Sequence, residues 1–245
     1  MRAMPSRQIG LGLVELMIGI AIGLMVVAGA SFMMLTQLSE HRRLSLETQV
    51  QQDLRAAAAL MQQEVRHAGF WAAADRGVRT LDAPPPQASP YAIDRPCGLA
   101  ASPTQFAYAY SSHATDYLTD VGEAIGTKEN DVLDSDEIFG FRVSNKALQF
   151  MFGCPDGQAR WQPLTDLATL KIVTPTSFDV AVDTIDLSAI CARPCPAAGG
   201  NCPRAHVRRI HITLTGEAAH DASVKRTVQV FSRQRNDRIE GACPT

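Results

Sequence analysis

The most constraining feature of this 245-residue sequence is an apolar run from Leu11 to Leu35 that contains a single charge, Glu15. As a helix this run would be roughly 37 Å long, which is enough to cross a lipid bilayer. A wholly soluble chain rarely carries such a run. Apolar residues make up 46% of the chain and charged residues 20%, so the rest of the sequence can form a folded core, and a disordered or collagen-like chain is excluded.

Glu15 separates the possible interpretations of this run. A simple signal anchor explains the apolar residues but gives no reason for a carboxylate, which costs about 2.5–3.5 kcal/mol at the bilayer centre. A cleaved signal peptide is the second interpretation, since Ala28-Gly29-Ala30 fits a signal peptidase site and cleavage there would leave Ser31 as the first residue. The position of Glu15 and the helical pattern across that site favour a third interpretation, in which the apolar helix is retained.

The residues around Gly10 resemble the class III signal of type IV pilins and pseudopilins. Gly10 is followed by Leu-Gly-Leu-Val-Glu-Leu, and in that family a prepilin peptidase cleaves after the glycine on the cytoplasmic side and methylates the new amino terminus. The resemblance implies a leader over residues 1–10, cleavage between Gly10 and Leu11, and a retained helix. It also implies an assembly role for Glu15, whose carboxylate would pair within the bilayer with the amine of Leu11 on its own or a neighbouring chain.

A second helical pattern continues beyond the apolar run. Residues 6–83 contain no proline, and apolar residues recur at steps of three and four, at Leu46, Val50, Leu54, Ala57, Met61, Val65 and Ala68. With Gly69 as a stop, the sequence predicts one helix over about 11–69, with a transmembrane part (11–35) and an amphipathic part (36–70). This stripe either forms a separate coiled coil or packs on its own domain, and its shortness favours packing against a sheet.

The end of the amphipathic part is similar to the matching stretch of PilW-type minor pilins. Residues 61–71 read Met-Gln-Gln-Glu-Val-Arg-His-Ala-Gly-Phe-Trp, and in that family an acidic, apolar and Arg group precedes Ala-Gly and an aromatic residue. The order of parts along the chain, with an Asp-Glu-Ile-Phe strand entry and a cysteine-rich insertion, also resembles this family. The resemblance implies a subunit that starts a type IV pilus or lies at its tip. The partners it implies are other minor pilins, the major pilin, a pilus-tip adhesin, the prepilin peptidase and the inner-membrane assembly platform.

Residues 71–245 change to short apolar segments separated by turn-forming residues, which predicts a periplasmic, β-rich globular domain. Strands are expected at 106–110, 137–143, 147–152, 170–174, 178–182, 207–215 and 227–232. Residues 144–146 predict a hairpin between the second and third of these strands, and residues 209–215 and 225–231 alternate like two antiparallel strands with one buried face. A long helix followed by strands predicts an α+β fold, which the resemblance makes type IV pilin-like.

Six cysteines follow the apolar run, at Cys97, Cys154, Cys191, Cys195, Cys202 and Cys243. An even number on one side of a membrane segment indicates an oxidising compartment such as the bacterial periplasm, so disulfides are favoured, although the sequence does not choose their pairing. The alternative is a metal site formed by three thiolates of residues 191–202 with His206 or His211, but the cysteine spacing differs from that of common zinc sites. We therefore expect no metal and no cofactor, and we expect both histidines to be ordinary surface residues.

Charge is distributed unevenly, although the net charge is only −2. Residues 129–137 are acidic and fit a solvated loop better than a calcium site, because the glycine of an EF-hand loop is absent. Residues 203–245 contain 8 Lys and Arg against 4 Asp and Glu, and on alternating strands such cations usually form an exposed face or pair with acids. Nucleic acid binding through this basic tail is therefore the less favoured interpretation.

The sequence contains no motif for catalysis. It lacks a G-x-S-x-G elbow, a P-loop, an H-E-x-x-H helix and a dinucleotide-binding glycine set. The sequence therefore favours a structural subunit of the inner membrane and then of the pilus, and not an enzyme. Two alternatives stay open: a minor pseudopilin of a type II secretion system, and a secreted, disulfide-bonded binding domain released by cleavage after Ala30.

Overall fold

The structure is a computed structural model that describes residues 12–77, 87–112, 130–196 and 201–244. Its internal contacts divide the chain into two units, Met1–Leu46 and Glu47–Thr245. The second unit, here called the head, contains the end of helix α1 (Leu13–His67) and two antiparallel sheets. Short 3₁₀ helices lie between these elements, among them η1 (Ala74–Gly77), η2 (Pro96–Gly98), η4 (Pro155–Gly157) and η5 (Ser188–Ile190).

Helix α1 is continuous from Leu13 to His67, close to the predicted span. It contains no proline, and its acidic first turn and basic last turn complement the helix dipole. The helix ends just before Gly69, which has a φ of +74° and donates its backbone N–H to the carbonyl of Ala109. This left-handed conformation suits glycine, so Gly69 ends the helix as the sequence predicts.

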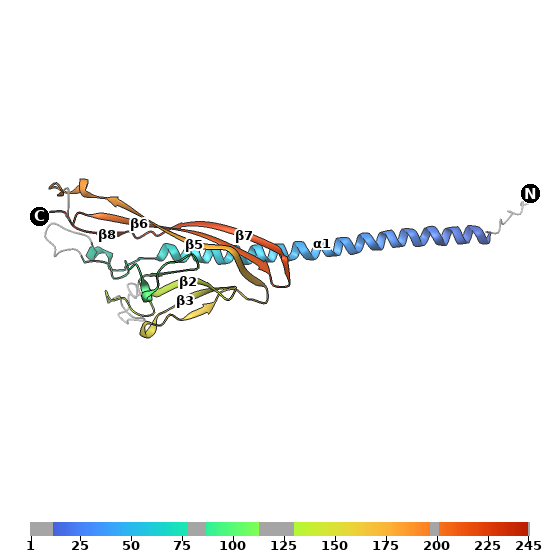
Figure 1. Ribbon diagram of the computed structural model, residues 1–245, viewed down its shortest axis with the longest axis horizontal. Coiled ribbons are helices and arrows are strands. Elements are labelled where there is room, and N and C mark those ends of the chain that lie inside the picture. Colours follow the sequence, from blue (N-terminus) through green and yellow to red (C-terminus); the bar gives the residue numbers. More distant parts are fainter. Residues whose placement is uncertain (1–11, 78–86, 113–129, 197–200, 245) are drawn as a thin grey trace, which may run out of the picture. The chain divides into compact units, whose positions relative to one another are not determined.

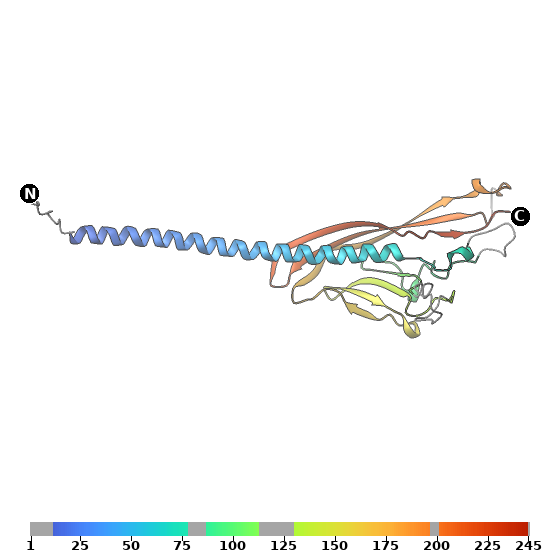
Figure 2. The ribbon, with the colours of Figure 1, turned by 180° about the vertical axis from the view of Figure 1, so that it is seen from behind.

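The apolar stripe of α1 forms part of the head core. Leu46, at the start of the stripe, is half-buried. The other predicted stripe residues are buried: Val50, Leu54, Ala57, Met61, Val65 and Ala68. Figures 1 and 2 show this half of α1 lying between the two sheets. The prediction of an amphipathic half packed on the chain's own sheet is therefore confirmed, and the coiled-coil alternative is wrong.

The first sheet has the strand order β1-β2-β3-β4. Its strands are β1 (Gln105–Ala109), β2 (Ile138–Ser144), β3 (Ala147–Phe152) and β4 (Trp161–Pro163). β2 and β3 form the predicted hairpin, in which Asn145 and Lys146 take the positive φ angles of a two-residue turn. Its face toward α1 carries aromatic residues such as Phe106 and Phe141, whose ring centroids are 5.7 Å apart. β4 was not predicted, because three residues are too few to show alternation.

The second sheet has the strand order β5-β6-β7, with β8 pairing to β6. Its strands are β5 (Leu170–Asp186), β6 (Arg204–Ala218), β7 (Asp221–Arg233) and β8 (Arg238–Glu240). The segments predicted at 170–174 and 178–182 are both strand, as expected, but they belong to one strand, β5, so the predicted break between them is wrong. The register of β5 against β6 shifts between Val173 and Ser177. Pro175 lies inside this shift, where its nitrogen has no hydrogen to donate to the ladder.

Helix α1 packs closely against the second sheet at a glycine. A Cβ placed on Gly216 of β6 would lie 2.5 Å from Cδ1 of Leu170 and 3.1 Å from Cδ2 of Leu54. Glycine therefore leaves the space that the stripe of α1 fills. One long helix packed on antiparallel sheets confirms the α+β fold class.

Candidate assembly segment

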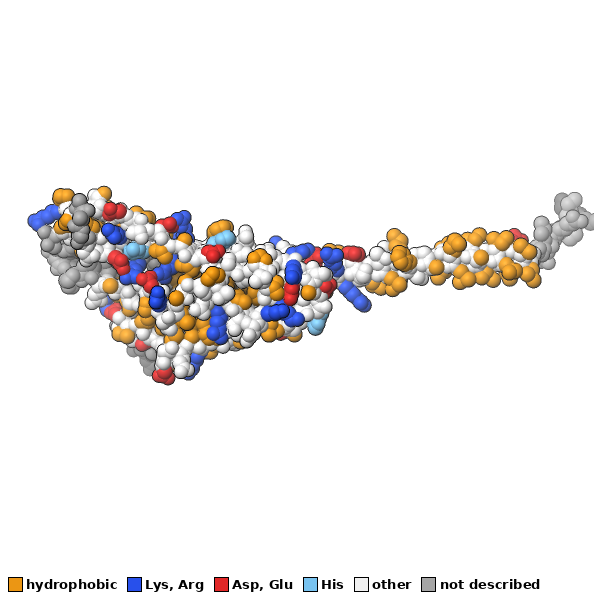
Figure 3. All heavy atoms as spheres, viewed as in Figure 1, with side chains coloured by type: hydrophobic (Ala, Val, Ile, Leu, Met, Phe, Trp, Pro, Cys, Tyr) orange, Lys and Arg blue, Asp and Glu red, His pale blue; other side chains and the backbone are white. Residues whose placement is uncertain are grey.

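The first half of α1 is exposed on all sides. Every residue from Gly12 to Ser45 is exposed, and the large apolar side chains from Leu13 to Leu38 leave 46–78% of their surface accessible. Figure 3 shows hydrophobic side chains covering this stretch of the helix. By length and composition it can cross a membrane. An apolar surface of this extent is unfavourable in water, so the segment requires lipid or other helices around it.

Glu15 lies in the first turn of α1, within this apolar half. Its backbone N–H donates to the carbonyl of Gly12 at 3.0 Å. Its side chain is exposed, and the residues that the structure describes offer it no hydrogen bond or ion pair. The predicted cleavage residues, Gly10 and Leu11, lie outside the described residues. Cleavage at this site and pairing of Glu15 with the Leu11 amine therefore stay predictions.

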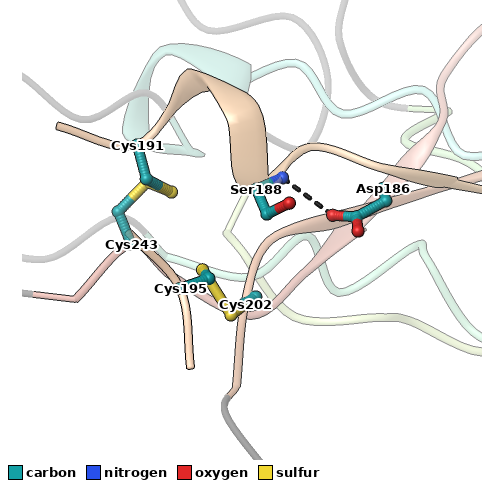
Figure 4. The surroundings of a disulfide bond; sticks show 6 residues. All are labelled: Asp186, Ser188, Cys191, Cys195, Cys202 and Cys243. Atoms are coloured by element: carbon teal, nitrogen blue, oxygen red, sulfur yellow. Dashed lines mark hydrogen bonds between the residues drawn. A yellow bond between two sulfur atoms is a disulfide. The ribbon is translucent and has the colours of Figure 1, made fainter. Parts of the chain in front are cut away.

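The six cysteines form three disulfides, Cys97–Cys154, Cys191–Cys243 and Cys195–Cys202. Figure 4 shows the last two near η5, where Asp186 accepts a hydrogen bond from the backbone N–H of Ser188 at 2.8 Å. Hydrogen bonds from the backbone and the hydroxyl of Ser188 lower the pKa of Asp186. Because these sulfurs are bonded to one another, residues 191–202 offer no thiolate for the alternative metal site.

The two histidines of that alternative lie on β6 and have partners within the sheet. Nε2 of His206 is 3.1 Å from the carboxylate of Glu240, and His211 stacks on Phe231 with ring centroids 4.1 Å apart. Since they are five residues apart on one strand, His206 and His211 point to opposite faces of the sheet. They therefore cannot join one metal site, and both are half-buried residues at the surface of the sheet.

The acidic stretch, described over residues 130–137, is more than a solvated loop. Glu137 is 2% exposed and accepts hydrogen bonds from the hydroxyl of Tyr91 at 3.0 Å and from two backbone N–H groups. Asp131 accepts a hydrogen bond from the indole N–H of Trp71 at 3.0 Å. The expectation of a solvated loop is wrong for these two acids, which connect the loop to neighbouring segments.

Most cations of the basic tail are paired with acids. The pairs are Arg208–Asp94, Arg238–Asp94, Arg209–Asp183, Lys225–Glu217, Arg226–Glu47 and Arg233–Asp237. Several of these acids come from earlier parts of the chain, so the excess of positive charge after residue 203 is largely balanced inside the head. This agrees with the expectation that the cations pair with acidic neighbours.

Glu64, the acidic residue of the stretch 61–71 quoted above, joins α1 to the first sheet. Glu64 accepts hydrogen bonds from the hydroxyl groups of Tyr108 at 3.2 Å and Tyr110 at 3.4 Å. Burial, together with the nearby carboxylate, raises the pKa of both tyrosines above the ordinary value. Glu64 precedes Tyr108 by 44 residues and Tyr110 by 46, and a local pattern cannot reveal contacts over such separations.

The head resembles a known protein family. The family model described as prepilin peptidase-dependent protein B matches residues 43–233. None of the curated proteins and none of the solved structures is significantly similar to the chain. The match begins after the apolar run and extends to the end of β7. It therefore rests on the head and is independent of the residues around Gly10 that resemble a pilin signal.

Proposed function

We propose, since the chain belongs to the family of prepilin peptidase-dependent protein B, that it is a PilW-type minor pilin of the type IV pilus. Membership of this family makes the chain a type IV pilus-related, prepilin-processed protein. In our proposal the prepilin peptidase cleaves between Gly10 and Leu11 and methylates Leu11. The apolar helix then stays in the inner membrane, with the head in the periplasm, until the subunit enters the pilus.

The observation that carries this proposal is the contrast between the two halves of α1. From Val50 onward the helix buries its stripe in the head, whereas Gly12–Ser45 is exposed throughout. A signal sequence that is cleaved off does not need to share a helix with the core of the mature domain. Here the amphipathic half is one continuous helix with the apolar half, which suits a subunit that keeps both.

Glu15 would set the axial position of the apolar half relative to the helices of neighbouring subunits. A carboxylate within a bilayer costs about 2.5–3.5 kcal/mol near the centre, and a cationic partner at the same depth offsets this cost. The amine that cleavage creates at Leu11 is such a cation. When subunits assemble, the pairing of Glu15 with Leu11 of a neighbouring chain would fix the axial position of one helix against the next.

The proposal assigns the chain a structural role in pilus initiation. Its partners would be other minor pilins, the major pilin, a tip adhesin and the inner-membrane assembly platform, and the peptidase would act on it. We propose that the chain is not an enzyme and requires no cofactor. Among the described residues, His, Cys, Asp and Glu form no group that could hold a metal ion.

Sequencing the amino terminus of the mature chain tests the proposal directly. We expect the protein purified from membranes to begin with N-methylated Leu11. A chain that begins at Ser31 would instead identify a secreted domain and would refute the proposal, because the apolar helix would be gone.

Removing the Glu15 carboxylate tests its assembly role. We expect Glu15→Ala to reduce surface pili at least tenfold while the chain still fractionates with the inner membrane. Glu40→Ala is the matched control, since it removes another exposed acid from the same half of α1, and it should leave piliation unchanged. Normal piliation with Glu15→Ala would contradict the proposed pairing.

A type II secretion pseudopilin is the alternative that shares this processing. Deleting the gene separates the two functions, because a pilin mutant loses surface pili while its secreted enzymes still leave the cell. Loss of secretion with normal pili would identify the chain as a pseudopilin of the secretion system.

A further inference from the structure

Strand β5 forms one margin of the second sheet, and its first part is covered by the first sheet. The backbone N–H of Ile172 donates to the carbonyl of Lys146 at 2.7 Å, and that of Phe178 donates to the carbonyl of Pro103 at 2.9 Å. Lys146 lies in the β2–β3 turn and Pro103 lies shortly before β1. These bonds satisfy the edge of β5 as far as Phe178.

The rest of this edge, residues 179–186, is open. Backbone groups alternate in direction along a strand, so those of Val180, Val182 and Thr184 point away from β6, as those of Phe178 do. Among the described residues, these three N–H and three carbonyl groups have no hydrogen-bond partner. A row of unpaired backbone groups is a template on which another strand can form.

Residues 179–186 also lack the features that usually protect an edge strand. They contain no proline, lysine or arginine, and their register against β6 is regular. Val182 and Ile185 are each 50% exposed and lie on opposite faces of the strand. By contrast, β7 at the other margin of the sheet carries Lys225 and Arg226. The open part of β5 is therefore suited to pairing with a further strand.

A hollow of about 320 Å³ lies beside the open edge. Its lining includes Val182 of β5, His206 and Arg208 of β6, and Arg238 of β8. The two arginines donate to the carboxylate of Asp94 at 2.6 and 2.8 Å. Because these charges are already paired, the hollow does not require a charged guest, and Val182 supplies an apolar contact for an incoming side chain.

We infer that an extended segment of a different pilus subunit pairs with residues 179–186 as an additional strand of the second sheet. Its backbone would bond to the outward N–H and carbonyl groups of the open edge. Its alternate side chains would contact Val182 in the hollow and Ile185 on the opposite face. The inference rests on the proposed function and deepens it by naming the surface through which this subunit meets another.

The charge of the open edge indicates which segment fits it. Residues 179–186 contain three Asp and neither Lys nor Arg. Asp183 pairs with Arg209, whereas Asp179 has no cationic partner within the described ranges. A segment of β-branched residues flanked by Lys or Arg therefore complements the edge. The same edge of a second copy of this chain would bring like charges together, which destabilises paired strands.

Site-specific photocrosslinking in cells tests this contact in the full chain. The chain carries Ile185→benzoylphenylalanine, and the other minor pilins, the major pilin and the tip adhesin each carry a different tag. We expect an adduct of the chain with one of these tagged subunits. The matched control is Gln229→benzoylphenylalanine, because Gln229 is an exposed residue of β7 at the other margin of the same sheet. It should give at least tenfold less of this adduct.

A proline at the open edge tests whether backbone hydrogen bonds form the contact. Val182→Pro removes an N–H that bonds to no described residue, so β5 keeps its pairing with β6. Combined with the photoreactive residue at position 185, it should reduce the adduct at least tenfold. Val182→Thr, which keeps the N–H and the branched shape, should leave the adduct within twofold, and circular dichroism melts of both variants check that the head is folded.

A charge change tests the edge without altering its backbone. Asp179→Lys adds the kind of cation that protects natural edge strands and repels a segment flanked by Lys or Arg. It should reduce the adduct at least fivefold, and it decides the question if the proline variant does not fold.

The inference is overturned by the absence of an adduct from position 185, or by an adduct that Val182→Pro and Asp179→Lys leave unchanged. An adduct only with a second copy of this chain, or only with a protein outside the pilus, overturns it as well. If the adduct is absent while the mature chain begins at methylated Leu11, the contact is refuted and the proposed function stands. A mature chain that begins at Ser31 instead refutes the proposed function.

Discussion

Leu54 offers the most direct measurement of how α1 contributes to the head. The side chain is fully buried and lies against Gly216 of β6, where an added Cβ would be 3.1 Å from its Cδ2. Substitution Leu54→Ala removes apolar atoms from a point where α1 packs closely against β6. Because Gly216 has no side chain that can move into the space, the cavity should stay largely open.

The expected cost follows from this geometry. Buried Leu→Ala substitutions cost about 2–5 kcal/mol, and the value increases with the size of the cavity that remains. We expect about 4 kcal/mol for Leu54→Ala. For a domain of this size each kcal/mol lowers Tm by roughly 2–4 °C, so Tm should fall by about 8–16 °C.

Thermal unfolding of the full chain in detergent, followed by tryptophan fluorescence, measures this effect. Trp71 is buried in the head and Trp161 lies on β4, so both report on the head. Leu38→Ala is the matched control: it makes the same chemical change in the exposed half of α1, where Leu38 is 46% accessible, and should change the free energy of unfolding by less than about 0.5 kcal/mol. Equal Tm values for the two variants would refute the conclusion that the second half of α1 belongs to the head core.

Three further predictions concern the head. The pKa values of Tyr108 and Tyr110 are raised in the folded protein, so these tyrosines ionise first in the unfolded chain. Their contribution to the free energy of unfolding should therefore be constant below about pH 10 and fall above it, by up to about 1.4 kcal/mol per pH unit for each tyrosine. Denaturant titrations should show a smaller fall for the variant in which both tyrosines are replaced by Phe. Gly216→Val should lower Tm or prevent folding, because the added side chain collides with buried leucines, as circular dichroism melts can show. Removing Cys97–Cys154, which closes 57 residues, should cost about 4 kcal/mol by loop entropy in the same melts.

Features with a local period could be predicted from the sequence. The step of three and four residues from Val50 to Ala68 predicted both the helix and its buried face, because a helix returns to the same side at that spacing. The β2–β3 hairpin was also predictable, since Asn145 and Lys146 interrupt two alternating runs. By contrast, the continuity of β5 was not predicted, since it is the pairing with β6 on both sides of Pro175 that joins the two segments into one strand.

Features that depend on distant partners could not be predicted. Glu137 reads as one more acid of a solvated loop until Tyr91 and two backbone N–H groups are brought to it. The pairing of Cys191 with Cys243 likewise requires the positions of two segments that are 52 residues apart. Charge and cysteine counts indicate which chemistry is available, but the chain path decides which groups meet.

Two glutamates of α1 differ in their hydrogen-bond partners. Glu64 has two tyrosine donors from its own head. Glu15 stands among side chains that cannot donate a hydrogen bond, and the described residues supply none. In our proposal, cleavage after Gly10 creates a cationic amine at Leu11, four residues before Glu15 in the sequence. The cut that leaves the apolar helix on the protein thus also creates the charge that Glu15 lacks, so processing and assembly depend on the same pair of groups.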